Sequence, residues 1–332
     1  MKLLVTGASG FIGGHFAREA MRQGHQVRIN GRRAEAVADL VAQGAQFYSG
    51  DLSSRQWAEQ LCEDIEVVVH CAGAVGAWGS YEQFHHGNVT LTEHVINGCL
   101  RQGVRRLVHL SSPSIYFDGR AHVGIREEQI PQRFANAYGR TKYLAEQRVF
   151  AAQREGLEVL ALRPRFVTGA GDTSIFPRLI NMQRKGRLSI LGDGLNQVDF
   201  TSIDNLNQAL TLAVNATGPA LGKAYNISNG QPLPLWDVIN YVLRQLHLPP
   251  VRKHLPYPVA YMAACLNEGL CHLLPGKPEP SLLRLGVAVM AKDFSLDISR
   301  AREYLGYAPQ PTLWQALDDF CQWWQAREAA QE

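Results

Sequence analysis

The chain has 332 residues, of which 19% are charged, and its formal net charge is +3. This length allows one large α/β unit with a smaller lobe, and the small net charge without a dense basic run argues against a nucleic-acid partner. The six cysteines form no CxxC pair, and the eleven histidines form no HExxH motif. We therefore expect reduced thiols, no bound metal and a cytoplasmic location.

No part of the sequence has both the length and the apolarity of a transmembrane span. The first apolar run is also too short for a cleaved signal. The segment closest to a span, 258–274, is interrupted by Asn267 and Glu268. Three interpretations of this segment stay open: a cap over a binding site, a peripheral contact with a membrane surface, and a helix packed inside the lobe.

Glycines near the N-terminus predict a dinucleotide-binding turn. An apolar strand, Lys2–Thr6, leads directly to Gly7, Gly10 and Gly13, and a helical stretch follows at 14–23. Gly7 can take the tight turn, Gly10 lets phosphate oxygens approach the backbone, and Gly13 lets the helix pack closely on the sheet. The unpaired N–H groups and the dipole of the helix N-terminus then favour a pyrophosphate.

Strands and helices alternate regularly through the first half of the chain. We expect further strands at 26–30, 45–48, 67–72, 106–111 and 158–163, and helices at 34–43, 88–103 and 138–155. This alternation predicts a Rossmann-type doubly wound parallel sheet that binds ligands at the carboxyl ends of its strands. We assign residues 1–168 to the dinucleotide-binding domain, with 199–228 returning to it. The predicted C-terminal substrate lobe comprises 169–198 and 229–332.

A tyrosine and a lysine on the long helix suggest proton-transfer chemistry. Tyr138 and Lys142 are four residues apart, so their side chains share one helix face. A nearby ammonium should lower the pKa of the phenol, which can then exchange a proton with a substrate hydroxyl. Ser111 and Ser112 end the preceding strand, where Ser112 could bind the same substrate oxygen. A polar turn without catalytic function would also explain the serines.

A series of ordered motifs makes the chain resemble the extended short-chain dehydrogenase/reductase family. The matching segments are 6–13, Asp51-Leu52, His70-Cys71-Ala72-Gly73, 111–116, 138–142 and Arg163-Pro164. This resemblance implies an NAD(P)-dependent oxidoreductase with Ser112, Tyr138 and Lys142 as catalytic residues. The cofactor contacts that it implies are Gly7, Ser9, Gly10, Phe11, Ile12, Gly13, Asp51, Leu52, Cys71, Ala72, Gly73, Asn88, Tyr138, Lys142 and Pro164.

Within that family the chain looks most like the 3β-hydroxysteroid dehydrogenase branch, which includes sterol dehydrogenases and bacterial 2-alkyl-3-oxoalkanoate reductases. The similar segments are 111–119, 192–200 and 305–309. Sugar-nucleotide epimerases usually place a phosphate-binding arginine where this chain has Val198, and valine cannot make that contact. We therefore expect a hydrophobic substrate. Apolar side chains that could contact it, or simply form the core of the lobe, are Trp78, Phe166, Trp236, Tyr257, Tyr261 and Met262.

The end of the second strand favours NADP over NAD. NAD enzymes commonly have a carboxylate there, but this chain has Gly31 followed by Arg32 and Arg33. Two guanidinium groups can bind a 2′-phosphate that no carboxylate repels. In the alternative interpretation, Arg32 stacks on the adenine and Arg33 is solvated.

The sequence thus predicts an NADP-dependent oxidoreductase that interconverts a secondary alcohol and a ketone on a hydrophobic small molecule, of the 3-keto steroid or 3-keto acid type. A nucleotide-sugar epimerase or dehydratase on the same scaffold is the main alternative. A redox-sensing module without chemistry is less favoured, because such proteins commonly lose the Tyr138–Lys142 pair. The sequence leaves open whether the chain is a monomer or a homodimer.

Overall fold

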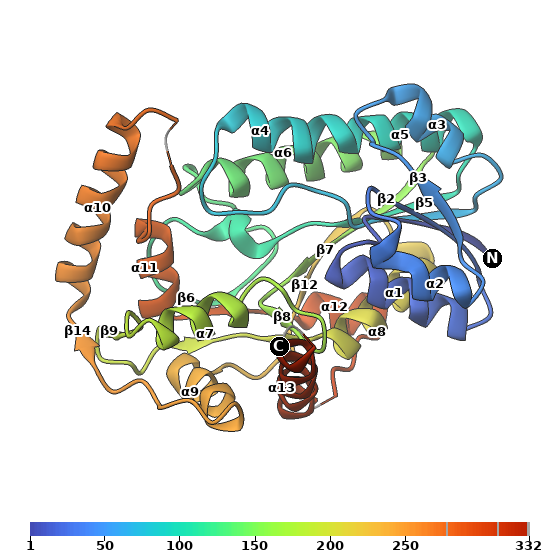
Figure 1. Ribbon diagram of the computed structural model, residues 1–332. Helices are drawn as coiled ribbons and strands as arrows, with labels where there is room; N and C mark the ends of the chain where they lie inside the picture. The colour runs from blue at the N-terminus through green and yellow to red at the C-terminus, as the bar shows by residue number, and fades with distance from the viewer. Residues whose placement is uncertain (277, 311, 331–332) are drawn as a thin grey trace.

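Seven parallel strands form the main sheet of the computed structural model, in the order β12-β7-β5-β4-β1-β2-β3 (Figure 1). Their bounds are Lys2–Thr6 (β1), Gln26–Gly31 (β2), Gln46–Ser49 (β3), Val67–His70 (β4), Arg106–Leu110 (β5), Glu158–Pro164 (β7) and Lys223–Ile227 (β12). The predicted doubly wound parallel sheet is confirmed. The structure describes residues 1–276, 278–310 and 312–330, so residues 277, 311, 331 and 332 of the predicted lobe lie outside it.

Helices cover both faces of this sheet. Parallel strands need crossover connections, and the helices of these connections pack on the faces of the sheet. On one face lie α3 (Arg55–Leu61), α4 (Tyr81–His85), α5 (Leu91–Gln102) and α6 (Ala137–Ala151). On the other lie α1 (Phe11–Arg22), α2 (Ala38–Ala42), α8 (Ile203–Asn215) and α12 (Ser299–Leu305). The strands between them are almost wholly apolar and buried, as a sheet covered on both faces requires.

The strand order reverses between β1 and β4. The chain proceeds from β1 outward to β2 and β3, and then returns to β4 on the opposite side of β1. Thr6 and His70, the last residues of β1 and β4, lie in register as neighbours. The loops that follow these two strands therefore open the crevice in which doubly wound sheets bind their ligands.

A smaller set of elements lies beyond the carboxyl ends of the main strands. Its four-stranded sheet has the order β13-β10-β15-β6. The strands are β6 (His122–Ile125), β8 (Val167–Thr168), β9 (Ile190–Leu191), β10 (Gln197–Val198), β11 (Thr201–Ser202), β13 (Leu233–Pro234), β14 (His254–Leu255) and β15 (Phe294–Leu296). The helices are α7 (Phe176–Arg184), α9 (Leu235–Gln245), α10 (Tyr257–Leu273), α11 (Arg284–Ala291) and α13 (Leu313–Ala329). The exact division of the chain into domains stays a prediction.

Helix α10 stands at the edge of the molecule and packs mainly against α11 (Figure 1). Its buried side chains are Ala260, Ala264, Glu268 and Cys271. Its opposite face exposes a stripe of apolar side chains, namely Val259, Met262, Leu266, Leu270 and Leu273. A helix packed entirely inside the lobe is therefore not what the structure shows, while a cap and a membrane contact stay predictions. Within the described ranges, no helix has the length and apolarity to cross a bilayer.

Several predicted boundaries differ from the structure. The helix expected at 34–43 is a 3₁₀ turn, Glu35–Val37, followed by the short α2, because the backbone at Val37 leaves the helical region. The strand expected at 67–72 ends at His70, so Cys71 and Ala72 lie in a loop. The helix expected at 88–103 starts as a π-helical turn, His86–Thr90, in which side-chain bonds of Asn88 replace regular helix geometry.

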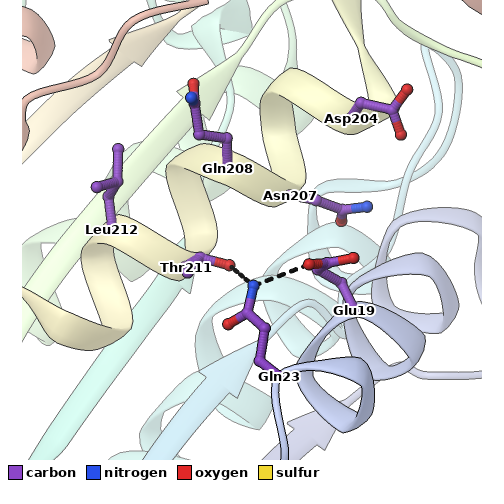
Figure 2. A pocket seen from close by; sticks show the side chains of 7 residues that line it. All are labelled: Glu19, Gln23, Asp204, Asn207, Gln208, Thr211 and Leu212. Carbon is purple, nitrogen blue, oxygen red and sulfur yellow. Dashed lines mark hydrogen bonds between the residues drawn. The ribbon is translucent and has the colours of Figure 1, made fainter.

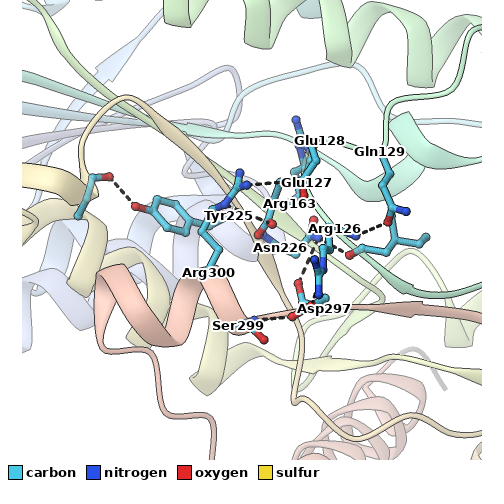
Figure 3. Close-up of polar contacts among 12 residues, drawn as sticks. Arg126, Glu127, Glu128, Gln129, Arg163, Tyr225, Asn226, Asp297, Ser299 and Arg300 are labelled. Atoms are coloured by element: carbon cyan, nitrogen blue, oxygen red, sulfur yellow. Dashed lines mark hydrogen bonds and ion pairs between the residues drawn. The ribbon is translucent and has the colours of Figure 1, made fainter.

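A buried polar network around Arg163 joins helix α6 to the smaller set of elements. Arg163 at the end of β7 donates to the Glu146 carboxylate on α6 and to the Tyr116 hydroxyl. It also donates to the backbone carbonyl of Glu127, at 2.9 Å. The Glu127 side chain accepts from the backbone N–H of Asn226 on β12, at 2.9 Å. Figure 3 shows this network continuing to Arg300, so one cluster connects five segments distant in sequence.

We expect Glu146→Gln to destabilise the protein by about 3–5 kcal/mol, because it leaves the buried Arg163 guanidinium without its counter-charge. The measurement is the free energy of unfolding from urea titration. The exposed pair Arg184–Glu328 provides the matched control, since Arg184→Gln should cost less than about 1 kcal/mol. Equal costs for the two variants would contradict the assigned role of the buried pair.

Candidate active site

The glycine turn after β1 has the shape of a phosphate cradle. Gly7 has a φ of +70°, and a Cβ there would lie 2.7 Å from the backbone nitrogen of Ala72. A Cβ on Gly13 would lie 2.6 Å from the carbonyl oxygen of Gly7. Gly10 is the N-cap of α1, so the free N–H groups of that helix start at the turn. Side chains are therefore excluded where a dinucleotide pyrophosphate would lie, and the residues present fit this group.

The other predicted cofactor residues lie around the same crevice. Phe11 and Ile12 begin α1, beside Ser9 in the turn. Leu52 is buried a few residues after β3, and Pro164 is the last residue of β7. Asp51 is exposed next to Leu52, and two hydrogen bonds from Ser53 to its Oδ1 hold the pKa of the Asp51 carboxyl low, with a smaller contribution from Arg32.

At the end of β2, the Ser9 side chain lies against Gly31, so a larger residue there would require Ser9 to move. A Cβ on Gly31 would lie 2.9 Å from the Ser9 hydroxyl oxygen. Arg32 and Arg33 follow on the surface, and Arg33 Nη2 donates to the Ser9 carbonyl oxygen at 3.1 Å. Arg33 is therefore tied to the glycine turn, unlike the purely solvated side chain that the alternative interpretation assumed.

The loop after β4 is fixed by Asn88. Its Oδ1 accepts from the backbone N–H of Ala74 at 2.9 Å, and its Nδ2 donates to Thr141 Oγ1 on α6 at 3.1 Å. A Cβ on Gly73 would lie 2.9 Å from Asn88 Oδ1 and 3.9 Å from Lys142 Nζ. The structure thus brings the predicted residues Cys71, Ala72 and Gly73 next to the catalytic helix.

The three predicted catalytic residues meet at the edge of the main sheet. Asn136 caps α6 by accepting from the backbone N–H of Gly139, which places Tyr138 in the first helical turn. Ser112 follows β5 close enough to Tyr138 to lower the pKa of the phenol, and its hydroxyl also donates to Ser114 Oγ at 3.1 Å. Lys142 lies one turn further along α6, and its Nζ donates to the carbonyl oxygen of Leu110 at 2.6 Å.

Burial controls the protonation of the two titrating groups. It raises the pKa of the Tyr138 phenol, and the hydrogen bond with Ser112 offsets only part of this increase. Burial also lowers the pKa of the Lys142 ammonium to about 8, against a smaller opposing effect of Glu146. The expectation that Lys142 lowers the pKa of Tyr138 is therefore not met in this structure, because the ammonium is directed to Leu110. A protonated Tyr138 is suited to donate a proton at neutral pH.

One structurally important residue was missed in the sequence. Glu146 lies one helical turn beyond Lys142, so Tyr138, Lys142 and Glu146 follow one face of α6 at a spacing of four residues. The repeated spacing was a signal that could have identified it. Its pairing with Arg163 could not be read from the sequence, because the two residues meet only when α6 packs on β7.

The expected apolar side chains are dispersed. Trp236 is buried in the core around α9, and Val198 is fully buried in β10. Trp78 belongs to the loop after β4 and not to the lobe, and its ring lies 4.6 Å from that of His272 on α10. This contact brings the end of α10 to the loop that precedes α4. Tyr261 and Met262 are exposed on α10.

A surface depression between α1 and α8 does not belong to this site (Figure 2). Polar side chains line it, and Gln23 Nε2 donates both to Glu19 and to Thr211 across it. These helices cover the face of the sheet opposite to α6. The part of the chain that the structure describes also holds no group of three or more His, Cys, Asp or Glu side chains placed for a metal ion.

Comparisons with known proteins agree with this geometry. Residues 3–228 match the model of the NAD dependent epimerase/dehydratase family. A 2-alkyl-3-oxoalkanoate reductase of Stenotrophomonas maltophilia is 38% identical, over 96% of this chain and 97% of that protein. A sterol-4-alpha-carboxylate 3-dehydrogenase, decarboxylating, of Mus musculus is 29% identical, over 96% of this chain and 89% of that protein.

A solved structure has the same fold. The UDP-glucuronic acid 4-epimerase of Bacillus cereus in complex with NAD superposes with a TM-score of 0.78, covering 98% of this chain and 99% of the epimerase at 23% identity. At this identity the likeness extends to the fold alone. Since the family model covers the strand–turn–helix of the glycine motif, the catalytic helix and β12, this chain belongs to the NAD dependent epimerase/dehydratase family.

Proposed function

We propose that this protein is an NADPH-dependent ketoreductase that interconverts a ketone and a secondary alcohol on a hydrophobic substrate. The observation that carries the proposal is the placement of Tyr138 next to Ser112 with Lys142 one turn away, at the edge of the sheet where the glycine turn opens. This constellation supports acid–base chemistry on an oxygen next to a nicotinamide.

In the proposed reaction each side chain has one task. When bound, the reduced nicotinamide supplies the hydride. Ser112 donates to the substrate carbonyl oxygen and orients it, while Tyr138 Oη transfers its proton to that oxygen. Lys142, one turn away on the same helix face, would hold the nicotinamide ribose, as the family resemblance implies. Because burial raises the pKa of Tyr138, the phenol is protonated at neutral pH, and this state favours reduction of the ketone.

The substrate proposal rests on apolarity and on the two relatives. A 2-alkyl-3-oxoalkanoate and a sterol-4α-carboxylate are both largely hydrocarbon, and both carry a carboxylate on the carbon next to the reacting one. Val198 is fully buried in β10 and offers no charge to a diphosphate. We therefore favour a long-chain 3-keto acid or a 3-keto steroid acid over a nucleotide sugar.

The proposed preference for NADP rests on the end of β2. Arg32 and Arg33 are exposed beside the glycine turn, and Gly31 supplies no carboxylate to bind the ribose hydroxyls of NAD. The guanidinium groups are suited to a 2′-phosphate.

We expect purified enzyme with NADPH to reduce a long-chain 2-alkyl-3-keto acid or a sterol ketone, followed at the absorbance of NADPH, and to leave UDP-glucose unchanged. Tyr138→Phe should reduce turnover by about 100-fold or more, because general acid catalysis typically contributes 10²–10⁴-fold. NADPH binding by this variant should stay close to normal, whereas Lys142→Ala should impair both. Epimerisation of UDP-glucose without ketone reduction would overturn the proposed function.

We expect Arg32→Ala combined with Arg33→Ala to weaken NADPH by about 10- to 100-fold, because each lost charge-assisted contact with a phosphate is worth about 1.5 kcal/mol or more. Binding of NADH should change little, since it has no 2′-phosphate. Isothermal titration of both cofactors measures this difference. Tighter binding of NADH than of NADPH by the unaltered enzyme would refute the preference.

We expect NADPH affinity to fall as the pH rises through about 8, since the Lys142 ammonium with its pKa of about 8 loses its proton there. The sign follows from binding: the cofactor prefers the charged lysine, so deprotonation of the free enzyme competes with it. Dissociation constants at pH values from about 6.5 to 9.5 test this linkage. The Lys142→Met variant serves as control, because it should bind more weakly at every pH and lack this pH step.

A further inference from the structure

We infer that Arg165 is the binding site for the carboxylate of the substrate. This inference rests on the proposed ketoreductase function and narrows its substrate to a β-keto acid, in which the carboxylate carbon is attached next to the ketone carbon. A residue that binds such a carboxylate must lie beside the residues that hold the ketone.

The backbone of Arg165 is fixed near those residues. Arg165 directly follows β7, where its N–H donates to the Ile227 carbonyl at 3.1 Å and its own carbonyl accepts from Thr201 Oγ1 at 2.6 Å. The neighbouring strand β5 leads into Ser112, and the two strands are paired up to Leu110 and Leu162. Arg165 and Ser112 therefore leave adjacent strands at the same edge of the sheet.

The side chain of Arg165 reaches the segment that follows the catalytic serine. Its guanidinium carbon lies 4.3 Å from the ring centroid of Phe294, and the Phe294 ring is 5.9 Å from that of Phe117. Phe117 ends the turn that Ser112 begins. Arg163, two residues earlier, faces α6, and strand alternation places Arg165 toward the same side of the sheet.

Arg165 differs from the other buried arginines in its hydrogen bonding. Arg106 and Arg163 are equally buried, and both donate to a carboxylate and to backbone carbonyls. Arg165 is only 6% exposed, yet its Nε and Nη2 have no hydrogen-bond partner among the described residues. Buried donors of a charged group are rarely left unpaired in a native protein, so these two are open to an added acceptor.

The one carboxylate that acts on Arg165 electrostatically does not fill this role. Burial lowers the pKa of Arg165 and attraction by Asp199 opposes this effect, but among the described residues the two side chains form no ion pair, and Asp199 Oδ1 is also a buried atom without a hydrogen-bond partner. Asp199 Oδ2 instead accepts from the backbone N–H of Leu296 at 2.6 Å. Burial also raises the pKa of Asp199 to about 6, so at neutral pH the carboxyl is still largely ionised and competes with an added anion. The two unpaired guanidinium donors nevertheless keep their capacity for such an anion.

Two aromatic rings hold the guanidinium plane in a fixed orientation. Its carbon lies 3.7 Å from the ring centroid of Phe166 and 4.3 Å from that of Phe294. Phe166 has a φ of +40°, a strained value for a residue with a large side chain. The unpaired donors Nε and Nη2 lie along one edge of the guanidinium, and a carboxylate accepts along such an edge with both oxygens.

The test compares a 2-alkyl-3-keto acid with its methyl ester, which has the same chain but no negative charge. The unaltered enzyme should have the higher kcat/KM for the acid, mainly through a lower KM. In Arg165→Gln the ratio of acid to ester kcat/KM should fall by about 10- to 100-fold, the usual value of a charge-assisted pair. Asp199→Asn is the matched control: it retains an acceptor for Leu296, and it should keep or raise the ratio because it removes a competing anion.

Three outcomes separate the claims. Equal efficiency of the unaltered enzyme on acid and ester would overturn the carboxylate site and leave the ketoreductase function intact, even if Arg165→Gln fails to fold. An unchanged ratio in a folded Arg165→Gln would also overturn it, as would equal loss of the ratio in Asp199→Asn, which would indicate a purely structural pair. No turnover of either compound by the unaltered enzyme would overturn the proposed function itself.

Discussion

The buried ion pair between Arg163 and Glu146 is the constraint on which the geometry of the site depends. Both side chains are almost inaccessible, at 3% and 0% exposure, so each charge is tolerable only in the presence of the other. Glu146 fixes α6 along its axis over the sheet, and Lys142 and Tyr138 follow one and two turns away. Arg163 fixes the end of β7, from which Pro164 and Arg165 emerge. The Arg163–Glu146 pair thus aligns α6 with the end of β7.

Burial determines the protonation states of Tyr138 and Lys142. The same low-polarity environment raises the pKa of the Tyr138 phenol and lowers that of the Lys142 ammonium to about 8. Both effects favour the neutral form of the group, so they cannot be attributed to attraction between the two. The phenol keeps its proton and the ammonium is close to losing one. Negative charge added near Lys142 would stabilise its charged form and raise the pKa of its ammonium.

The sequence predicted the sheet and the positions of the site residues because these follow local rules. Gly7 and Gly13 are required where no Cβ fits, and the spacing from Tyr138 to Lys142 requires only a helix. The electrostatics were predicted less well. Nothing in the sequence indicates that the Lys142 ammonium is directed to the Leu110 carbonyl, because that contact depends on how α6 packs against β5. The unpaired state of Arg165 is likewise a property of the assembled core, since it results from the absence of partners on several distant segments.

The positions of Arg165 and Val198 both bear on which anionic substrate the site would accept. From the sequence, we expect a sugar-nucleotide epimerase to have a phosphate-binding arginine at the position of Val198, which lies on β10 of the smaller lobe. Here Val198 is buried and pairs with Phe294 across β10 and β15, and the ring of Phe294 covers the Arg165 guanidinium. The cation therefore lies at the end of β7, next to the catalytic strand, and not out along the lobe. A cation at the position of Val198 would suit a diphosphate far from the reacting carbon. A cation at Arg165 suits a carboxylate on the carbon next to the reacting one.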